Sequence, residues 1–170
     1  MTAYVALLRA VNVGGRKLIM TELKGIADEL KLDDARTFIA SGNLLFRSKR
    51  SEESVKALLE KAIGEHMGAE VPVMVRTAAE MAAVVKGNPF PEDSQAKVAA
   101  IFLGDAPPSD TIDHAKNVAH ERVALGTREI YVAYPDGMGQ SKLRIPAAKA
   151  GTARNMNTVA KLAELLREME

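Results

Sequence analysis

The pattern of apolar and polar positions divides the chain into short strand-like runs and amphipathic helical segments. Residues 3–9 form a nearly continuous apolar run, which is typical of a buried central strand. Residues 20–30 then carry apolar side chains at helical spacing. Residues 36–40 and 43–47 predict two strands, and the Ser41-Gly42 step between them favours a hairpin.

The next two segments complete a β-α-β-β-α-β order. Residues 51–63 predict a helix, and the acidic side chains of its first turn suit the positive end of the helix dipole. Residues 71–76 predict a strand, which Pro72 assigns to a sheet edge or to a strand start. This order is the ferredoxin-like arrangement. Residues 1–76 are therefore predicted to form a first ferredoxin-like half.

The remaining residues, 77–170, echo this pattern without its final strand. Residues 77–80 match a capping box for a helix that ends at Gly87. A strand at residues 98–103 is followed by a predicted helix over residues 107–118. The repeated order predicts a second ferredoxin-like half.

The last third of the chain adds a hairpin and a terminal helix. Residues 122–125 and 130–134 predict two strands around a Gly-Thr turn. Residues 159–169 place apolar side chains on one side of a helix, with Asn155 or Asn157 as its cap. The polar segment between these elements, residues 135–156, is longer than most loops of compact domains, and a short helix is predicted near residues 141–145. The predicted fold class is α+β, with two ferredoxin-like halves packed as one compact unit.

Composition narrows the chemistry of the chain. It has 170 residues of which 47% are hydrophobic, enough for one domain or two small ones. It has no Cys, which excludes disulfides, thiolate metal sites and Cys nucleophiles. The three histidines lack metal-ligand spacing, so no metal site is predicted, and no cofactor motif is identified. No apolar run approaches the roughly 20 residues of a membrane span, and a signal peptide is not expected.

The net charge of +1 hides a local asymmetry. Residues 1–50 carry nine Lys/Arg and five Asp/Glu, a balance of +4, and residues 135–156 carry four Lys/Arg and one Asp, a balance of +3. The rest of the chain then sums to −6. Charge fluctuates by a few units along any chain, but here the positive excess overlaps two Gly- and Asn-rich loops. If these loops meet, their field favours an anion.

These loops are residues 9–17 and 151–158, and a third candidate is the Gly-rich segment 137–142. Glycine, free backbone amides, Arg and Lys suit a phosphate or carboxylate. Turn geometry, a helix cap and an internal ion pair explain the same residue types, and no Walker or dinucleotide spacing is present. No catalytic residue is singled out. The predicted ligand-binding residues are Arg9, Asn12, Gly14, Gly15, Lys142, Arg154 and Asn157.

Two alternatives to an anion-binding protein or enzyme stay open. A nucleic-acid-binding module shares the strand order, but its aromatic motif is absent and the net charge is small. A structural or protein-interaction domain could form a dimer through a sheet edge.

Four blocks of residues resemble domain-of-unknown-function family 1697. They are residues 4–15 (Tyr-Val-Ala-Leu-Leu-Arg-Ala-Val-Asn-Val-Gly-Gly), 41–43 (Ser-Gly-Asn), 141–143 (Ser-Lys-Leu) and 152–158 (Thr-Ala-Arg-Asn-Met-Asn-Thr). The chain has Ala10 where the family often has Gly and Met156 where it often has Trp. The resemblance implies a bacterial, cytoplasmic protein with two ferredoxin-like halves, and it implies no activity.

Overall fold

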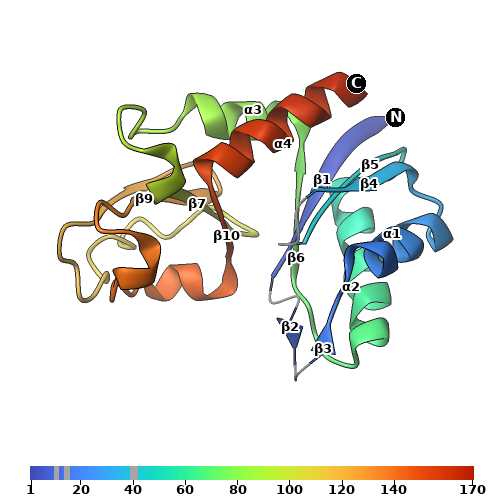
Figure 1. Cartoon of the computed structure of the whole chain (residues 1–170), viewed down its shortest axis with the longest axis horizontal. Coiled ribbons are helices and arrows are strands. Elements are labelled where there is room, and N and C mark those ends of the chain that lie inside the picture. The colour runs from blue at the N-terminus through green and yellow to red at the C-terminus, as the bar shows by residue number, and fades with distance from the viewer. Residues whose placement is uncertain (10–11, 14–15, 39–41) are drawn as a thin grey trace. The chain divides into compact units, whose positions relative to one another are not determined.

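The computed structural model describes residues 1–9, 12–13, 16–38 and 42–170, which form two compact units (Figure 1). Unit 1 comprises Met1–Glu80 and Leu162–Glu170, and unit 2 comprises Met81–Lys161. The predicted turn residue Ser41 lies outside the described residues.

Unit 1 contains a four-stranded antiparallel sheet and two helices. Its elements along the chain are β1 (Thr2–Leu8), β2 (Asn12–Val13), β3 (Arg16–Lys17), α1 (Met20–Glu29), β4 (Asp33–Thr37), β5 (Asn43–Ser48), α2 (Glu52–Met67) and β6 (Val73–Thr77). The sheet order is β4-β5-β1-β6, while β2 and β3 pair separately as a short ribbon. This is the ferredoxin-like order, so the predicted fold is confirmed for this unit.

Strand β1 is the center of unit 1, and both of its faces are buried. Tyr4, Ala6 and Leu8 belong to the core that the sheet forms with α1 and α2, which cover one face of it in Figure 1. Val5 and Leu7, on the opposite face, are fully buried too. Burial on both sides explains the unbroken apolar run, since neither set of alternating side chains faces water.

Local capping chemistry fixes the helix starts that the sequence predicts. The Ser51 hydroxyl accepts a hydrogen bond from the Ser54 amide at the start of α2. Thr77 and Glu80 form the predicted capping box of α3 (Ala78–Lys86): Glu80 N donates to Thr77 Oγ1 at 3.2 Å and Thr77 N to Glu80 Oε1 at 2.9 Å. Each pair satisfies amides that a helix leaves without partners.

Unit 2 contains a second four-stranded antiparallel sheet. After α3 its elements are the 3-10 helix Gln95–Lys97, β7 (Val98–Phe102), β8 (Arg122–Leu125), β9 (Glu129–Ala133), the 3-10 helices Met138–Gln140 and Pro146–Ala150, β10 (Thr152–Asn155) and α4 (Met156–Met169), which ends in unit 1. The sheet order is β10-β7-β9-β8, so its first, second, third and fourth strands are arranged as in unit 1. The predicted absence of a final strand is wrong, because β10 takes that place.

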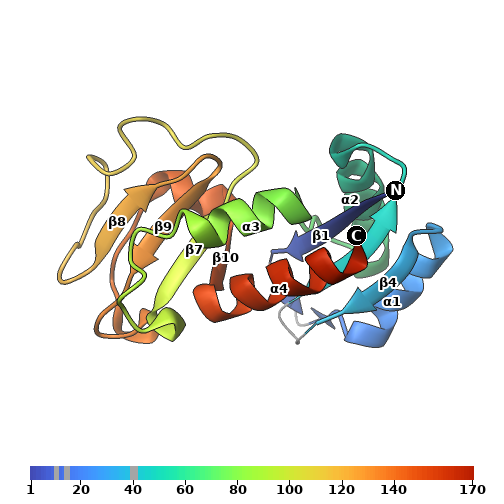
Figure 2. The same cartoon turned by 90° about the horizontal axis from the view of Figure 1, so that it is seen from above.

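The helix predicted over residues 107–118 is also wrong. Residues 109–114 form turns, and Figure 2 shows the connection from β7 to β8 as a long loop. Its apolar positions give only a narrow stripe: Ile112 and Val118 are 46% and 52% exposed, and Ala115 is partly buried against the sheet. Asn117 has φ of 59°, which is incompatible with continuing a right-handed helix.

Residues 141–145 are not helical either; the 3-10 turns flank them. Arg144 forms an isolated antiparallel bridge with Lys116, which holds this segment extended. The apolar core on this face of the sheet includes Ile101, Ile130 and Ile145. The long polar segment is therefore held against the sheet instead of forming its own helix.

Gly151 and Asn155 have structural roles at the start of β10 and of α4. A Cβ on Gly151 would lie 2.8 Å from side-chain atoms of Ile101 and Leu103, so the close approach of β10 to β7 requires glycine there. Asn155 Oδ1 accepts a hydrogen bond from Thr158 N at 2.9 Å, which confirms Asn155 as the cap of α4. Within the described residues, no helix has the length and apolar character needed to cross a bilayer.

Candidate functional site

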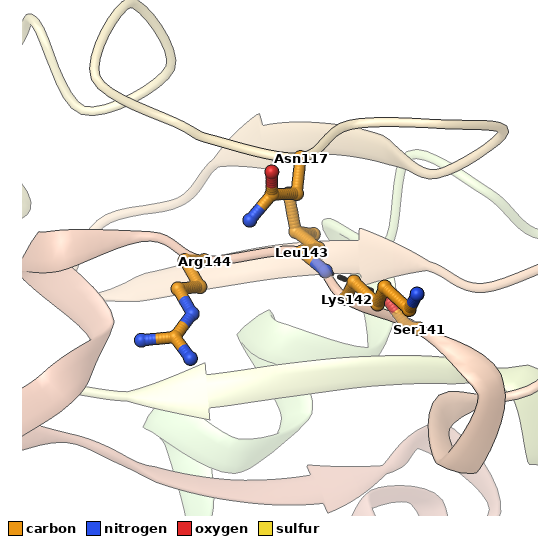
Figure 3. Close-up of a pocket in the computed structure, with 5 residues that line it drawn as sticks. All are labelled: Asn117, Ser141, Lys142, Leu143 and Arg144. Atoms are coloured by element: carbon orange, nitrogen blue, oxygen red, sulfur yellow. Dashed lines mark hydrogen bonds between the residues drawn. The ribbon is translucent and has the colours of Figure 1, made fainter.

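A pocket of about 450 Å³ lies in unit 2 between the loop that follows β7 and the segment that follows β9. Asn117 comes from the first, and the other lining residues come from the second (Figure 3). The lining is formed by Asn117, Ser141, Lys142, Leu143 and Arg144. It contains two cationic side chains, an amide and a hydroxyl, but no carboxylate.

Backbone pairing joins the two segments beside this pocket. Lys116 N donates to Arg144 O at 2.8 Å, and Arg144 N donates to Lys116 O at 2.9 Å. This bridge places Asn117 next to residues that are more than twenty positions away in sequence.

Side chains add two polar contacts between the same segments. Ser141 Oγ donates to Glu121 Oε2 at 2.7 Å and accepts from Leu143 N at 3.2 Å. His120 Nδ1 and Asp136 Oδ2 lie 2.6 Å apart. The pocket therefore has walls that are held together independently of any ligand.

These contacts shift two ionisation equilibria. The hydrogen bond from Ser141 lowers the pKa of Glu121, so this carboxylate stays charged beside the pocket. The hydrogen bond and charge of Asp136 raise the pKa of His120, because both favour the imidazolium.

Lys142 and Arg144 supply positive charge at this site. Both side chains are exposed, and in the part of the chain that the structure describes neither forms an ion pair. Leu143 separates them along the segment, and both line the pocket. Leu143 packs against the apolar core of unit 2 and so anchors the segment.

Asn117 is held in the left-handed region of backbone conformation, with φ of 59°. Asn is one of the few residues other than Gly that adopt this region readily, because its short side chain can hydrogen-bond locally. Figure 3 shows its amide on the wall opposite residues 141–144.

The residues predicted to bind a ligand fall in both units. Arg9 follows β1 in unit 1, where its amide donates to Pro72 O at 3.0 Å. Asn12 is in β2 of the same unit, while Gly14 and Gly15 lie outside the described residues. Lys142 lines the unit 2 pocket.

Arg154 and Asn157 lie in unit 2 but are not among the residues that line the pocket. Arg154 is buried in β10, where Nη1 donates to Thr152 Oγ1 and to Ala153 O, each at 2.9 Å. Burial lowers its pKa to about 10. Asn157 is exposed in the first turn of α4. At least one nitrogen of the Arg154 guanidinium is therefore used in hydrogen bonds within β10 itself.

Sequence reasoning did not assign Asn117 or Arg144 to the site. Arg144 contributes to the positive balance of residues 135–156, and that was the available signal for it. Asn117 had none, because its segment was predicted to be helical and its role depends on the bridge between Lys116 and Arg144.

The histidines, which were considered as metal ligands, each lie beside a carboxylate. His66, His114 and His120 are exposed, and each contacts one carboxylate, from Glu22, Asp110 and Asp136. Among the described residues, no group of three or more acids and histidines could hold a metal ion.

Two aromatic residues of the sheets, Phe46 and Tyr131, are not exposed for base stacking. Phe46 is fully buried, and Tyr131 is buried with its hydroxyl bonded to Val84 O at 2.8 Å. Phe38 and Tyr134 are partly exposed at strand ends. The stacking platform of an RNA-recognition motif is therefore not formed by Phe46 or Tyr131.

Comparison with known proteins agrees with this fold. A conserved bacterial protein, SP0830 from Streptococcus pneumoniae, has a similar solved structure with a TM-score of 0.81 and 23% sequence identity, covering 98% of this chain and 99% of that chain. No curated protein matches the chain. The family described as "Protein of unknown function (DUF1697)" matches residues 1–131. The chain therefore belongs to this family.

Proposed function

We propose that unit 2 binds a small anionic ligand, carrying a phosphate or carboxylate group, in the pocket beside Asn117. The observation that carries this proposal is the lining itself: Lys142 and Arg144 share the pocket with Asn117 and Ser141, without a carboxylate among the lining residues. An anion bound there contacts two cationic side chains, and among the described residues it breaks no ion pair of either one.

The side chains differ in what they offer the ligand. Arg144 can donate two parallel hydrogen bonds to one phosphate or carboxylate, whereas Lys142 acts as a compact positive charge. The Asn117 amide supplies a neutral donor from the facing wall. Ser141 already donates to Glu121, so its main role is to fix the local backbone through Leu143 N.

Thermal-shift titration with pyrophosphate, nucleotides, sugar phosphates and dicarboxylates tests the proposal. A ligand at 100 times its dissociation constant stabilises the folded protein by about 2.7 kcal/mol. For a chain of this size that is a rise in melting temperature of about 5–10 °C. We expect at least one of these anions to produce such a shift.

Charge-neutral variants locate the binding. Lys142→Gln combined with Arg144→Gln should abolish the shift, while Lys149→Gln, which neutralises another exposed lysine of unit 2, should keep it. A panel without any shift, or a double variant that binds as well as the wild type, would rule out this pocket. The other sequence-predicted ligand residues are Arg9, Asn12, Gly14, Gly15, Arg154 and Asn157. Gln or Ala variants in the same titration test each of them.

A further inference from the structure

The two sheets have four edge strands, β4 and β6 in unit 1 and β8 and β10 in unit 2. An edge strand presents N–H and C=O groups that can pair with another chain, and proteins protect such edges with charges, bulges or covering side chains. Three of these edges are protected in this way, and β8 differs from them.

Side chains cover the outer edge of β6. Its register with β1 points the backbone groups of Val73 and Val75 away from the sheet. Glu60 Oε2 accepts from Val73 N at 3.0 Å, and Lys56 Nζ donates to Val73 O. Arg76 Nη1 donates to Val75 O at 3.0 Å. Further pairing along this edge would have to displace these contacts.

Strands β4 and β10 are protected by other means. In β4 the register shifts between Asp33 and Arg36, and Asp34 has φ of 51°, so the edge is charged and interrupted. In β10 the register with β7 turns the carbonyl of Ala153 outward, where Arg154 Nη1 donates to it at 2.9 Å.

Strand β8 has an open edge. The Gly126 amide donates to Glu129 O at 2.7 Å, and this hairpin bond sets the alternation so that Ala124 pairs with Tyr131 of β9. Val123 and Leu125 therefore direct their N–H and C=O groups away from the sheet. In the part of the chain that the structure describes, no hydrogen bond reaches these outward groups.

The side chains of β8 do not obstruct pairing. Val123 and Leu125 are partly buried against the apolar core of unit 2, and β8 contains neither Lys, Pro nor a register shift. Arg122, its one charged residue, pairs with Asp93 and lies 4.8 Å from the center of the Phe90 ring. The open edge is thus short, regular and mostly apolar.

We propose that β8 pairs antiparallel with β8 of a second copy of this chain, around a two-fold axis at Ala124. Val123 then faces Leu125 of the partner subunit, and each such pair exchanges two N–H···O=C bonds. The unit 2 sheets of the two copies then form one continuous sheet.

Self-complementarity favours a second copy as the occupant of this edge. Because Val123 and Leu125 share one face, the pairing places apolar side chains next to apolar side chains across the axis. Arg122 falls opposite Gly126 of the partner subunit, which has no side chain to collide with it. The same strand therefore supplies both halves of an isologous interface.

Sedimentation velocity over a concentration series tests this pairing in the full chain. We expect the mass of the wild type to rise from 18.3 kDa toward twice that value. Val123→Pro removes an N–H that points outward and so spares the bonds to β9; it should stay monomeric. Val123→Thr keeps the amide and a similar shape, and it should still dimerise.

Hydrogen exchange provides a second measurement that does not depend on any variant. The amides of Val123 and Leu125 should become protected as the concentration rises, whereas the Ala124 amide, bonded within the hairpin, should be protected throughout. A chain that stays monomeric at all concentrations would overturn the proposal. So would a dimer in which the Val123 and Leu125 amides exchange as fast as in the monomer.

Discussion

Tyr131 connects β9 to α3 through one buried hydrogen bond. Its hydroxyl donates to Val84 O at 2.8 Å, one of the carbonyls at the end of α3 that lack a partner within the helix. Burial raises the pKa of Tyr131 to about 12. The contact thus depends on a neutral tyrosine whose charged form is disfavoured by its surroundings.

Tyr131→Phe should destabilise the protein by about 1–3 kcal/mol, because it leaves the buried carbonyl of Val84 unsatisfied. Urea denaturation measures this change. Tyr134→Phe is the matched control: Tyr134 is partly buried, and its hydroxyl has no hydrogen-bond partner among the described residues, so the change should stay within about 0.5 kcal/mol. Equal effects of the two variants would mean that the hydrogen bond is not the cause.

His120 gives the contact between the two loops of unit 2 a dependence on pH. Asp136 raises its pKa above the ordinary value of 6.5, so the folded protein holds this proton more tightly than the unfolded chain. The stabilisation is complete below pH 6.5 and is lost as the pH rises through the folded-state pKa.

An NMR titration of the His120 ring should therefore show a midpoint above 6.5. Asp136→Asn should lower that midpoint, because the variant removes the charge and the strongest acceptor. Asp110→Asn, which changes the carboxylate beside His114 instead, should leave the His120 midpoint where it was. A midpoint that does not respond to Asp136→Asn would contradict this assignment.

At the level of the pocket, the Gly-rich surroundings of Lys142 made it a predicted ligand residue, while no sequence pattern pointed to Asn117. The first depends on local composition, while the second depends on a bridge between distant segments. Gly151 and Arg154, whose residue types suggested a ligand loop, also have structural roles. Gly151 allows a close approach of β10 to β7, and Arg154 donates to its own strand.

Among the elements, those defined by local chemistry were predicted well. Thr77 and Asn155 each cap a helix as expected, because a cap needs only a side-chain acceptor and amides two or three positions ahead. Strand β10 was missed because residues 152–155 have no apolar alternation, and their burial comes from pairing with β7. The helix predicted over residues 107–118 failed because its apolar stripe was too narrow to bury.

The capping box of α3 allows a quantitative test at this scale. Thr77→Ala removes the acceptor for Glu80 N and should cost about 1 kcal/mol in the free energy of unfolding. Thr77→Ser keeps the hydroxyl and should lose much less. Chemical denaturation of both variants measures the difference. If serine were as destabilising as alanine, the loss would come from the missing methyl group rather than from the cap.

For the molecule as a whole, the order of strands was accessible from sequence in unit 1 and, except for β10, in unit 2. The division of the chain into its two units was not accessible from sequence, because unit 1 is discontinuous along the chain. It includes Leu162–Glu170, the final turns of α4. The sequence pattern shows that α4 has an apolar face, but only the fold shows which residues of α4 belong to unit 1 and which belong to unit 2.

Leu166 tests this discontinuity, since it is fully buried in the part of α4 that belongs to unit 1. Leu166→Ala should cost about 2–5 kcal/mol, as for other large-to-small changes in a core. Hydrogen exchange followed by mass spectrometry should show faster exchange in β1 and β6, although they precede Leu166 by more than eighty residues. Arg167→Ala, at the exposed neighbouring position, should leave exchange unchanged. Faster exchange confined to β7, β9 and β10 would instead assign the end of α4 to unit 2.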